Sequence, residues 1–324
     1  MLTKVNLITG FLGSGKTTTI RHLLSRKPED EVWAVLVNEF GEIGIDGALL
    51  SDTGALLKEI PGGCMCCVNG LPMQVGLNML LQKKPHRLLI EPTGLGHPKQ
   101  ILNLLTAEAY QPWLQLQATL CLLDARQLGD SRCLENENFR DQLAAADVIV
   151  ANKEDTWQDS DRDALMAWYQ QQGQDRRLIT VAQGQLDIAV LDLPRENHNA
   201  LPDARHHHHA AAKTGLAALK LTGRESWRRA LNQGQGYYAC GWIFDGDTQF
   251  NTASLLDWVR LAPVSRVKGV MRIPEGTLVV NRQGFDLRIE TQSAAPPDSR
   301  IEIINESEAE WNTLQKQLLN SRLM

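Results

Sequence analysis

The feature that most constrains this chain is a glycine-rich loop near its start. Residues 10–17 read GFLGSGKT and match GxxxxGK[ST], between an apolar strand expected at 4–8 and a helix expected at 16–25. In such a P-loop, glycines let the backbone approach phosphate, and the helix N-terminus directs N–H groups at the anion. Lys16 would neutralise the β- and γ-phosphates, and the Thr17 hydroxyl would ligate Mg²⁺. The residues predicted to bind nucleotide here are Gly10, Gly13, Ser14, Gly15, Lys16, Thr17 and Thr18.

Further apolar runs follow the loop and alternate with segments compatible with helices. They lie at 33–37, 87–90, 118–123, 148–151 and 178–181. This alternation is typical of a mainly parallel sheet with helices on both faces. The sequence therefore predicts an α/β fold, with a P-loop domain over residues 1–193 of the 324.

The composition changes after residue 193. Prolines, alanines and the tract His206–His209 predict a linker over 194–214, with a second domain over 215–324. That domain has strands expected at 239–244, 268–273 and 300–304, a helix at 252–261 and a hairpin pairing 277–281 with 286–290. We expect a smaller α+β domain.

A helix is expected at the end of the chain. Ser307 followed by Glu310 matches a capping box, and Trp311, Leu314 and Leu318 then recur on one helical face.

Charge and hydropathy exclude several classes of function. The chain has 33 Lys and Arg against 38 Asp and Glu, a net charge of −5, and no long basic run, which disfavours nucleic-acid binding. It has no apolar run long enough to span a membrane, and its N-terminus leads directly into the glycine loop rather than a signal-peptide cleavage site. We expect a cytoplasmic protein; the sequence leaves a homo-oligomer open.

The four residues 152–155 read NKED and follow an apolar strand. The Asp155 carboxylate could accept both the ring N1–H and the exocyclic amine of guanine, a donor pair that adenine lacks. A polar match of this length is also typical of a helix N-terminus. With a P-loop upstream, the pattern favours guanine and predicts Asn152, Lys153 and Asp155 as base-binding residues.

Two acidic segments are expected near the phosphates. Glu91 follows the strand at 87–90 and could reach Mg²⁺ directly or through water, while the Gly94 amide could meet the γ-phosphate. The predicted catalytic residues are thus Lys16, Thr17 and Glu91. Glu39, Glu42 and Asp46 lie in a glycine-containing segment that we interpret as a switch. The Glu91 segment could instead be a strand-ending carboxylate with a turn, and the segment with Glu39, Glu42 and Asp46 could be a polar surface loop.

Three cysteines, Cys64, Cys66 and Cys67, fall within four residues and predict a metal site. Thiolates suit Zn²⁺ rather than Mg²⁺, and Cu(I) stays open. Four contiguous residues cannot easily form a complete tetrahedron, so an exchangeable ligand should complete it, with Glu42 the first candidate. Alternatives are a static zinc clip or small buried residues. The histidine tract is either an auxiliary metal-loading arm or a solvated segment.

Taken together, GFLGSGKT, NEFGE, GGCMCC, EPTG and NKED in this order resemble the P-loop GTPases of the CobW type, which are metallochaperones. The resemblance covers essentially the whole chain, since the part from about Tyr237 is similar to the CobW C-terminal domain. It implies GTP hydrolysis coupled to holding zinc and handing it to a client metalloprotein. It assigns Cys64, Cys66 and Cys67 to zinc. No glutamine follows Gly94 as in Ras-like enzymes, so we expect slow intrinsic turnover.

The order of these segments suggests how the two sites are coupled. The cysteine loop lies between the acidic segment at 38–46 and the Glu91 strand, so γ-phosphate binding would tighten the zinc site and hydrolysis would weaken it. One alternative is a regulatory GTPase with a structural zinc. Another is a zinc reservoir with little GTP turnover. A small-molecule kinase is disfavoured by NKED.

Overall fold

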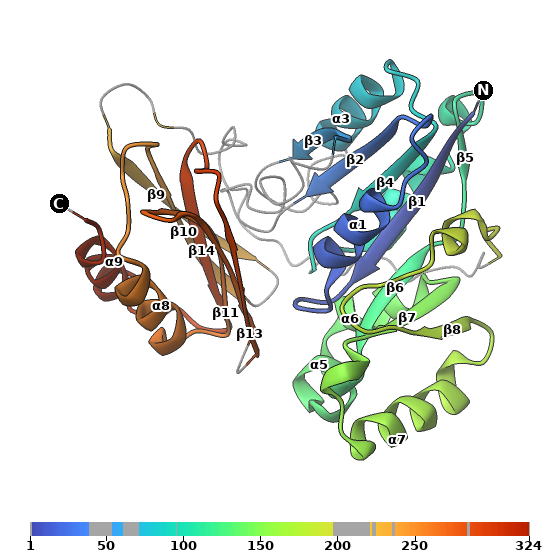
Figure 1. Cartoon of the computed structure of the whole chain (residues 1–324). Helices are drawn as coiled ribbons and strands as arrows, with labels where there is room; N and C mark the ends of the chain where they lie inside the picture. The colour runs from blue at the N-terminus through green and yellow to red at the C-terminus, as the bar shows by residue number, and fades with distance from the viewer. Residues whose placement is uncertain are drawn as a thin grey trace. The chain divides into compact units, whose positions relative to one another are not determined.

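The computed structural model describes residues 2–38, 54–60, 71–94, 96–196, 221, 225–234, 237–283 and 286–323 (Figure 1). Of these residues, 2–196 belong to one compact unit and 221–323 to another. Most of the predicted linker, residues 197–214, lies outside the described residues. Within the described ranges, no helix is long and apolar enough to cross a membrane.

The first unit is built on a parallel sheet, as predicted. Its described strands are ordered β3-β2-β4-β1-β6-β7-β8, with β5 beside β1, and each of these pairings is parallel. The central strands are buried on both faces, which explains their continuous apolar runs. The bounds are β1 Thr3–Gly10, β2 Trp33–Asn38, β3 Leu56–Ile60, β4 Arg87–Glu91, β5 Leu114–Leu116, β6 Leu120–Asp124, β7 Val148–Asn152 and β8 Arg177–Thr180.

Helices cover both faces of this sheet, which confirms the predicted layers. Ile20 and Leu23 of α1 pack in one core with Val35. Leu77 of α3 and Ile101 of α4 pack in a second core on the opposite face. The helices are α1 Lys16–Ser25, α3 Leu71–Leu81, α4 Pro98–Leu105, α5 Ser131–Glu135, α6 Glu137–Ala144 and α7 Asp159–Trp168, with the short 3₁₀ helix η3 at Ala125–Gly129.

The strand register aligns the carboxyl ends of the strands. Gly10 at the end of β1 pairs with Leu122 of β6, and Asp124 at the end of β6 pairs with Asn152 of β7. On the other side of β1, Glu91 ends β4. Loops that follow these strands therefore leave from one edge of the sheet.

The second unit is an antiparallel sheet with two helices, as predicted for an α+β domain (Figure 1). Its described strands are ordered β13-β12-β11-β14-β10-β9, and α8 and α9 contribute to the same hydrophobic core. The bounds are β9 Trp227–Gly234, β10 Tyr237–Phe244, α8 Thr252–Leu261, β11 Arg266–Ile273, β12 Gly276–Gln283, β13 Asp286–Gln292, β14 Ser299–Asn305 and α9 Trp311–Asn320. The expected hairpin is confirmed by the pairing of β12 with β13.

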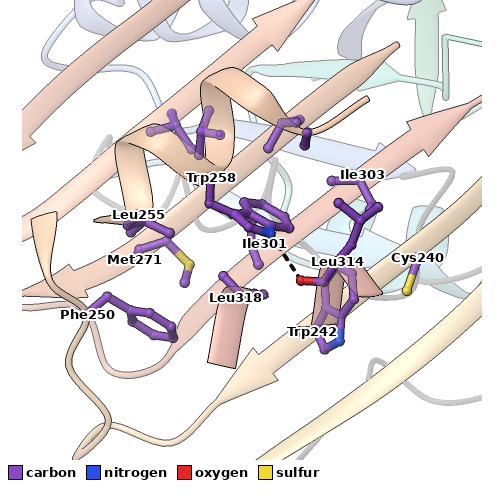
Figure 2. Packing of buried hydrophobic residues seen from close by; sticks show 14 of the residues in the cluster. Cys240, Trp242, Phe250, Leu255, Trp258, Met271, Ile301, Ile303, Leu314 and Leu318 are labelled. Carbon is purple, nitrogen blue, oxygen red and sulfur yellow. Dashed lines mark hydrogen bonds between the residues drawn. The ribbon is translucent and has the colours of Figure 1, made fainter. Parts of the chain in front are cut away.

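Aromatic residues hold the core of this unit together (Figure 2). The rings of Trp242 and Trp258 meet edge to face at 6.2 Å. Trp258 also donates its Nε1–H to the Leu314 carbonyl of α9 at 3.0 Å, so the N–H group of this buried indole is hydrogen-bonded. This hydrogen bond connects α8 to α9, which pack in the same core as the sheet.

The predicted capping box at the last helix is wrong. The N-cap of α9 is Glu310, which makes no side-chain cap hydrogen bond. Ser307 lies too far before the helix, and its hydroxyl and carbonyl instead accept from Asn305 Nδ2 at 3.3 and 3.1 Å. The predicted apolar face is confirmed, since Trp311, Leu314 and Leu318 are buried.

We predict that Phe244→Ala destabilises the second unit by about 3–5 kcal/mol, because it removes a fully buried ring that packs edge to face on Phe250 at 4.8 Å. Urea unfolding followed by tryptophan fluorescence would measure this. The control Leu261→Ala, at a side chain 79% exposed, should change the free energy of unfolding by less than about 0.5 kcal/mol. Equal stability of Phe244→Ala and wild type would contradict this description of the core.

Candidate functional site

The P-loop has the geometry that its sequence predicts. Helix α1 begins at Lys16, directly after the loop. The buried Lys16 ammonium donates to the carbonyls of Gly10 at 2.8 Å and Phe11 at 3.4 Å, which holds it within the loop. Gly15 has a φ of 98°, and a Cβ there would lie 2.3 Å from Asn152 Nδ2. Only glycine suits this position, where the loop passes close to the carboxyl end of β7.

Asn152 joins the P-loop to the loop that follows β8. Its Nδ2 donates to the Ser14 carbonyl at 2.9 Å, and its Oδ1 accepts from the Gly184 N–H at 2.9 Å. The buried amide of this predicted guanine-binding residue thus aligns two loops. Sequence reasoning missed Gly184, although it follows a strand at the same sheet edge as the other site residues.

Lys153 and Asp155 lie beside Asn152, as their spacing requires. Lys153 has a left-handed backbone with φ 67°, and its Nζ lies 3.2 Å from Asp124 Oδ2. Asp155 is exposed and accepts from Gln183 Nε2 at 3.4 Å. An exposed carboxylate here is available to hydrogen-bond donors on a ligand.

Asp124 is a site residue that sequence reasoning missed. It ends β6, its side chain is 6% exposed, and it also pairs with Arg126 at 2.7 Å. Two cations around one nearly buried carboxylate compensate for its loss of hydration. The available signal was an acid at the end of an apolar strand, the same signal that pointed to Glu91.

The residues predicted to bind Mg²⁺ lie together. Thr17 donates its hydroxyl to Glu91 Oε1 at 3.0 Å, and Glu91 is 2% exposed. A hydroxyl and a carboxylate are the hard oxygen ligands that Mg²⁺ prefers, so this pair fits the predicted cation.

Gly94 lies against the P-loop. A Cβ at Gly94 would be 2.8 Å from the backbone N of Leu12, so the close approach requires glycine. The neighbouring Leu12 carbonyl accepts from Gln127 Nε2 at 3.0 Å. The predicted γ-phosphate residue and the P-loop are therefore in contact.

The predicted metal ligands Glu42, Cys64, Cys66 and Cys67 lie outside the described residues, as do Glu39, Asp46 and His206–His209. Their flanking elements are described. Ile60, the last residue of β3, pairs with Asn38 at the end of β2, and α3 begins at Leu71. Strand β3 thus ends at the carboxyl edge of the same sheet.

The cysteines within the described ranges do not form a metal site. Burial raises the pKa of the Cys121 and Cys240 thiols to about 12, so both are protonated at neutral pH. No group of three His, Cys, Asp or Glu side chains that could hold a metal was found among the residues that the structure describes.

This strand–loop–helix unit, with its Lys16, Thr17 and Glu91 at one sheet edge, defines a P-loop nucleotide-binding protein. The family model "CobW/HypB/UreG, nucleotide-binding domain" matches residues 4–180, and "Cobalamin synthesis protein cobW C-terminal domain" matches 239–322. The chain belongs to the CobW/HypB/UreG family.

Two relatives of this chain are named zinc chaperones. The chain is 67% identical over 324 residues to the zinc chaperone YeiR of Escherichia coli K12, covering 99% of each chain. It is 30% identical over 194 residues to the zinc chaperone YjiA of the same organism, covering 58% of this chain and 60% of YjiA. The solved structure of Zn(II)-bound YjiA GTPase matches over 100% of both chains at 19% identity, with a TM-score of 0.44.

We predict that Asp124→Asn weakens binding of a guanine nucleotide roughly tenfold, about 1.4 kcal/mol, because Lys153 loses its charged partner. Titration with fluorescent GDP would measure the affinity. Asparagine retains the ability to cap η3, so the local fold should persist.

The matched control is Asp130→Asn. Asp130 makes the same contact with an arginine two residues later and also caps a helix, but the Arg132 side chain of its pair is 69% exposed. This control should bind GDP like wild type. If Asp124→Asn also binds like wild type, Asp124 does not position Lys153.

Proposed function

We propose that this protein is a zinc chaperone that hydrolyses GTP to GDP and phosphate and couples hydrolysis to zinc transfer. The observation that supports this most is the common sheet edge: β1, β4 and β7 end there with the P-loop, Glu91 and Asn152, and β3 ends there before the cysteine segment. The 67% identity to a zinc chaperone across both domains supports the same function.

The nucleotide would bind through the P-loop and the NKED segment. Gly10, Gly13 and the loop up to Thr18 would hold the phosphates, with Gly94 on the γ-phosphate, and Asn152, Lys153 and Asp155 would select guanine. Mg²⁺ would bind to Thr17 and to Glu91, directly or through water, and neutralise charge on the phosphates. Lys16 adds a fixed positive charge within the loop.

Zinc is the cargo in this proposal. Cys64, Cys66 and Cys67 would hold it, with Glu42 as an exchangeable fourth ligand. Two of the strand pairings support coupling, since Ile60 pairs with Asn38 and the preceding Val37 pairs with Glu91. A rearrangement at Glu91 on γ-phosphate binding would therefore occur two strands from the start of the cysteine segment.

The coupling has a thermodynamic requirement. If GTP tightens zinc binding, zinc must tighten GTP binding by the same factor. A regulatory GTPase with a structural zinc, or a zinc reservoir with little turnover, would lack this reciprocity. We further propose a cytoplasmic location, a client metalloprotein as receiver, and domains over 1–193 and 215–324 joined by the linker at 194–214.

We predict that Cys66→Ala and Cys67→Ala each abolish the effect of zinc on GTP hydrolysis, because each removes a thiolate ligand. Binding of a fluorescent GTP analogue should stay within twofold of wild type, since the P-loop is intact. Phosphate release with and without Zn²⁺ would measure the effect.

The control variant is Cys133→Ala, which changes a partly buried cysteine of α5. It should respond to zinc like wild type. Unchanged zinc stimulation in both Cys66→Ala and Cys67→Ala would reject the coupling.

A further inference from the structure

One buried amide in α6 holds the segment that follows β4. Gln142 is 0% exposed, and its Nε2 donates to the carbonyls of Gly94 and Gly96, each at 3.0 Å. Both N–H groups of the side chain are thus used on the backbone on either side of residue 95. A single side chain fixes two peptide groups in the segment predicted to meet the γ-phosphate.

The two hydrogen bonds act on a glycine-containing turn, which the Gly96 N–H also closes by donating to the Thr93 carbonyl at 2.8 Å. Gly94 and Gly96 have no side chains, and glycine loses more conformational freedom on ordering than any other residue. A hydrogen bond to each carbonyl limits the rotation of these peptides. Gln142 therefore adds two restraints to this turn, at the Gly94 and Gly96 carbonyls.

The same helix also contacts the P-loop. The Phe139 ring meets the Phe11 ring edge to face, with centroids 5.5 Å apart. Asp141 Oδ2 lies 3.2 Å from Nδ1 of His97, the residue before α4. Consecutive turns of α6 thus hold both loops that would surround the terminal phosphate.

Gly94 lies directly against the P-loop, so the hydrogen bonds of Gln142 also affect how the two loops pack. Its backbone packs against Leu12, so closely that a Cβ would lie 2.8 Å from the Leu12 nitrogen. The two loops therefore cannot move independently: a Gly94 segment that rotates would collide with the P-loop.

We propose that Gln142 is a positioning residue for recognition of the γ-phosphate, and that it favours the binding of a triphosphate over that of a diphosphate. This inference rests on the proposed function. It assigns this role to a residue of α6: by fixing the peptide that follows Gly94, Gln142 limits rotation at Gly94 and so holds the Gly94 N–H in place.

The test compares two nucleotides on the full-length protein. Gln142→Met keeps the length and most of the volume of the side chain and removes both N–H donors. With Mg²⁺ present, we expect the affinity for a fluorescent non-hydrolysable GTP analogue to fall about tenfold or more. The affinity for fluorescent GDP, which lacks the γ-phosphate, should stay within twofold.

Two further variants test whether the effect is specific to the hydrogen bonds of Gln142. Gln100→Met makes the same change at an exposed glutamine of α4 and should affect neither affinity. Gln142→Asn keeps a buried amide but is one methylene shorter, so it cannot span both carbonyls and should show the same selective loss. It provides the test if Gln142→Met does not fold.

The outcomes separate the proposals. Equal loss of affinity for both nucleotides would show a merely structural role and overturn the inference, as would unchanged affinity for both. A wild-type protein that binds neither guanine nucleotide would overturn the proposed function, and this inference with it. Selective loss of the triphosphate in both Gln142 variants would support the inference.

Discussion

The common direction of the central strands is the constraint on which the rest of the first unit depends. Because β1, β4, β6 and β7 run parallel, their carboxyl ends meet at one edge, as observed in open α/β sheets that bind ligands there. The register then places Gly10, Glu91, Asp124 and Asn152 at strand ends along that edge. Residues more than a hundred positions apart in the chain meet at one sheet edge for this reason.

Side-chain amides then set the conformation of the loops. Asn152 donates to the Ser14 carbonyl, Gln127 to the Leu12 carbonyl and Gln142 to the Gly94 carbonyl. Each anchors a carbonyl oxygen, the backbone group that repels phosphate, by a hydrogen bond to the protein. A buried polar network of this kind fixes a loop when its donors are satisfied, and it couples the elements that contribute them.

The sequence predicted the elements that local pattern encodes. The GxxxxGKT motif placed α1 at its observed bounds, and apolar runs placed the buried strands. Neither β3 nor α3 was predicted, because LLKEI is short and mixed and α3 contains Pro72 and Gly76; packing against the sheet decides both. Gln142 escaped prediction because the carbonyls that it binds are more than forty residues away in sequence, and Asp124 was missed although it ends an apolar strand as Glu91 does. Thr17 was predicted because the P-loop motif names it, and Glu91 because it follows an apolar strand; the two side chains are hydrogen-bonded in the structure.

The central claim is that the nucleotide controls zinc affinity. It is tested most directly by a chelator-competition titration of Zn²⁺ on the full-length protein, with Mg²⁺ and a non-hydrolysable GTP analogue compared with Mg²⁺ and GDP. The account predicts that zinc binds about tenfold or more tightly with the GTP analogue, roughly 1.4 kcal/mol. Equal zinc affinities in the two nucleotide states would contradict it.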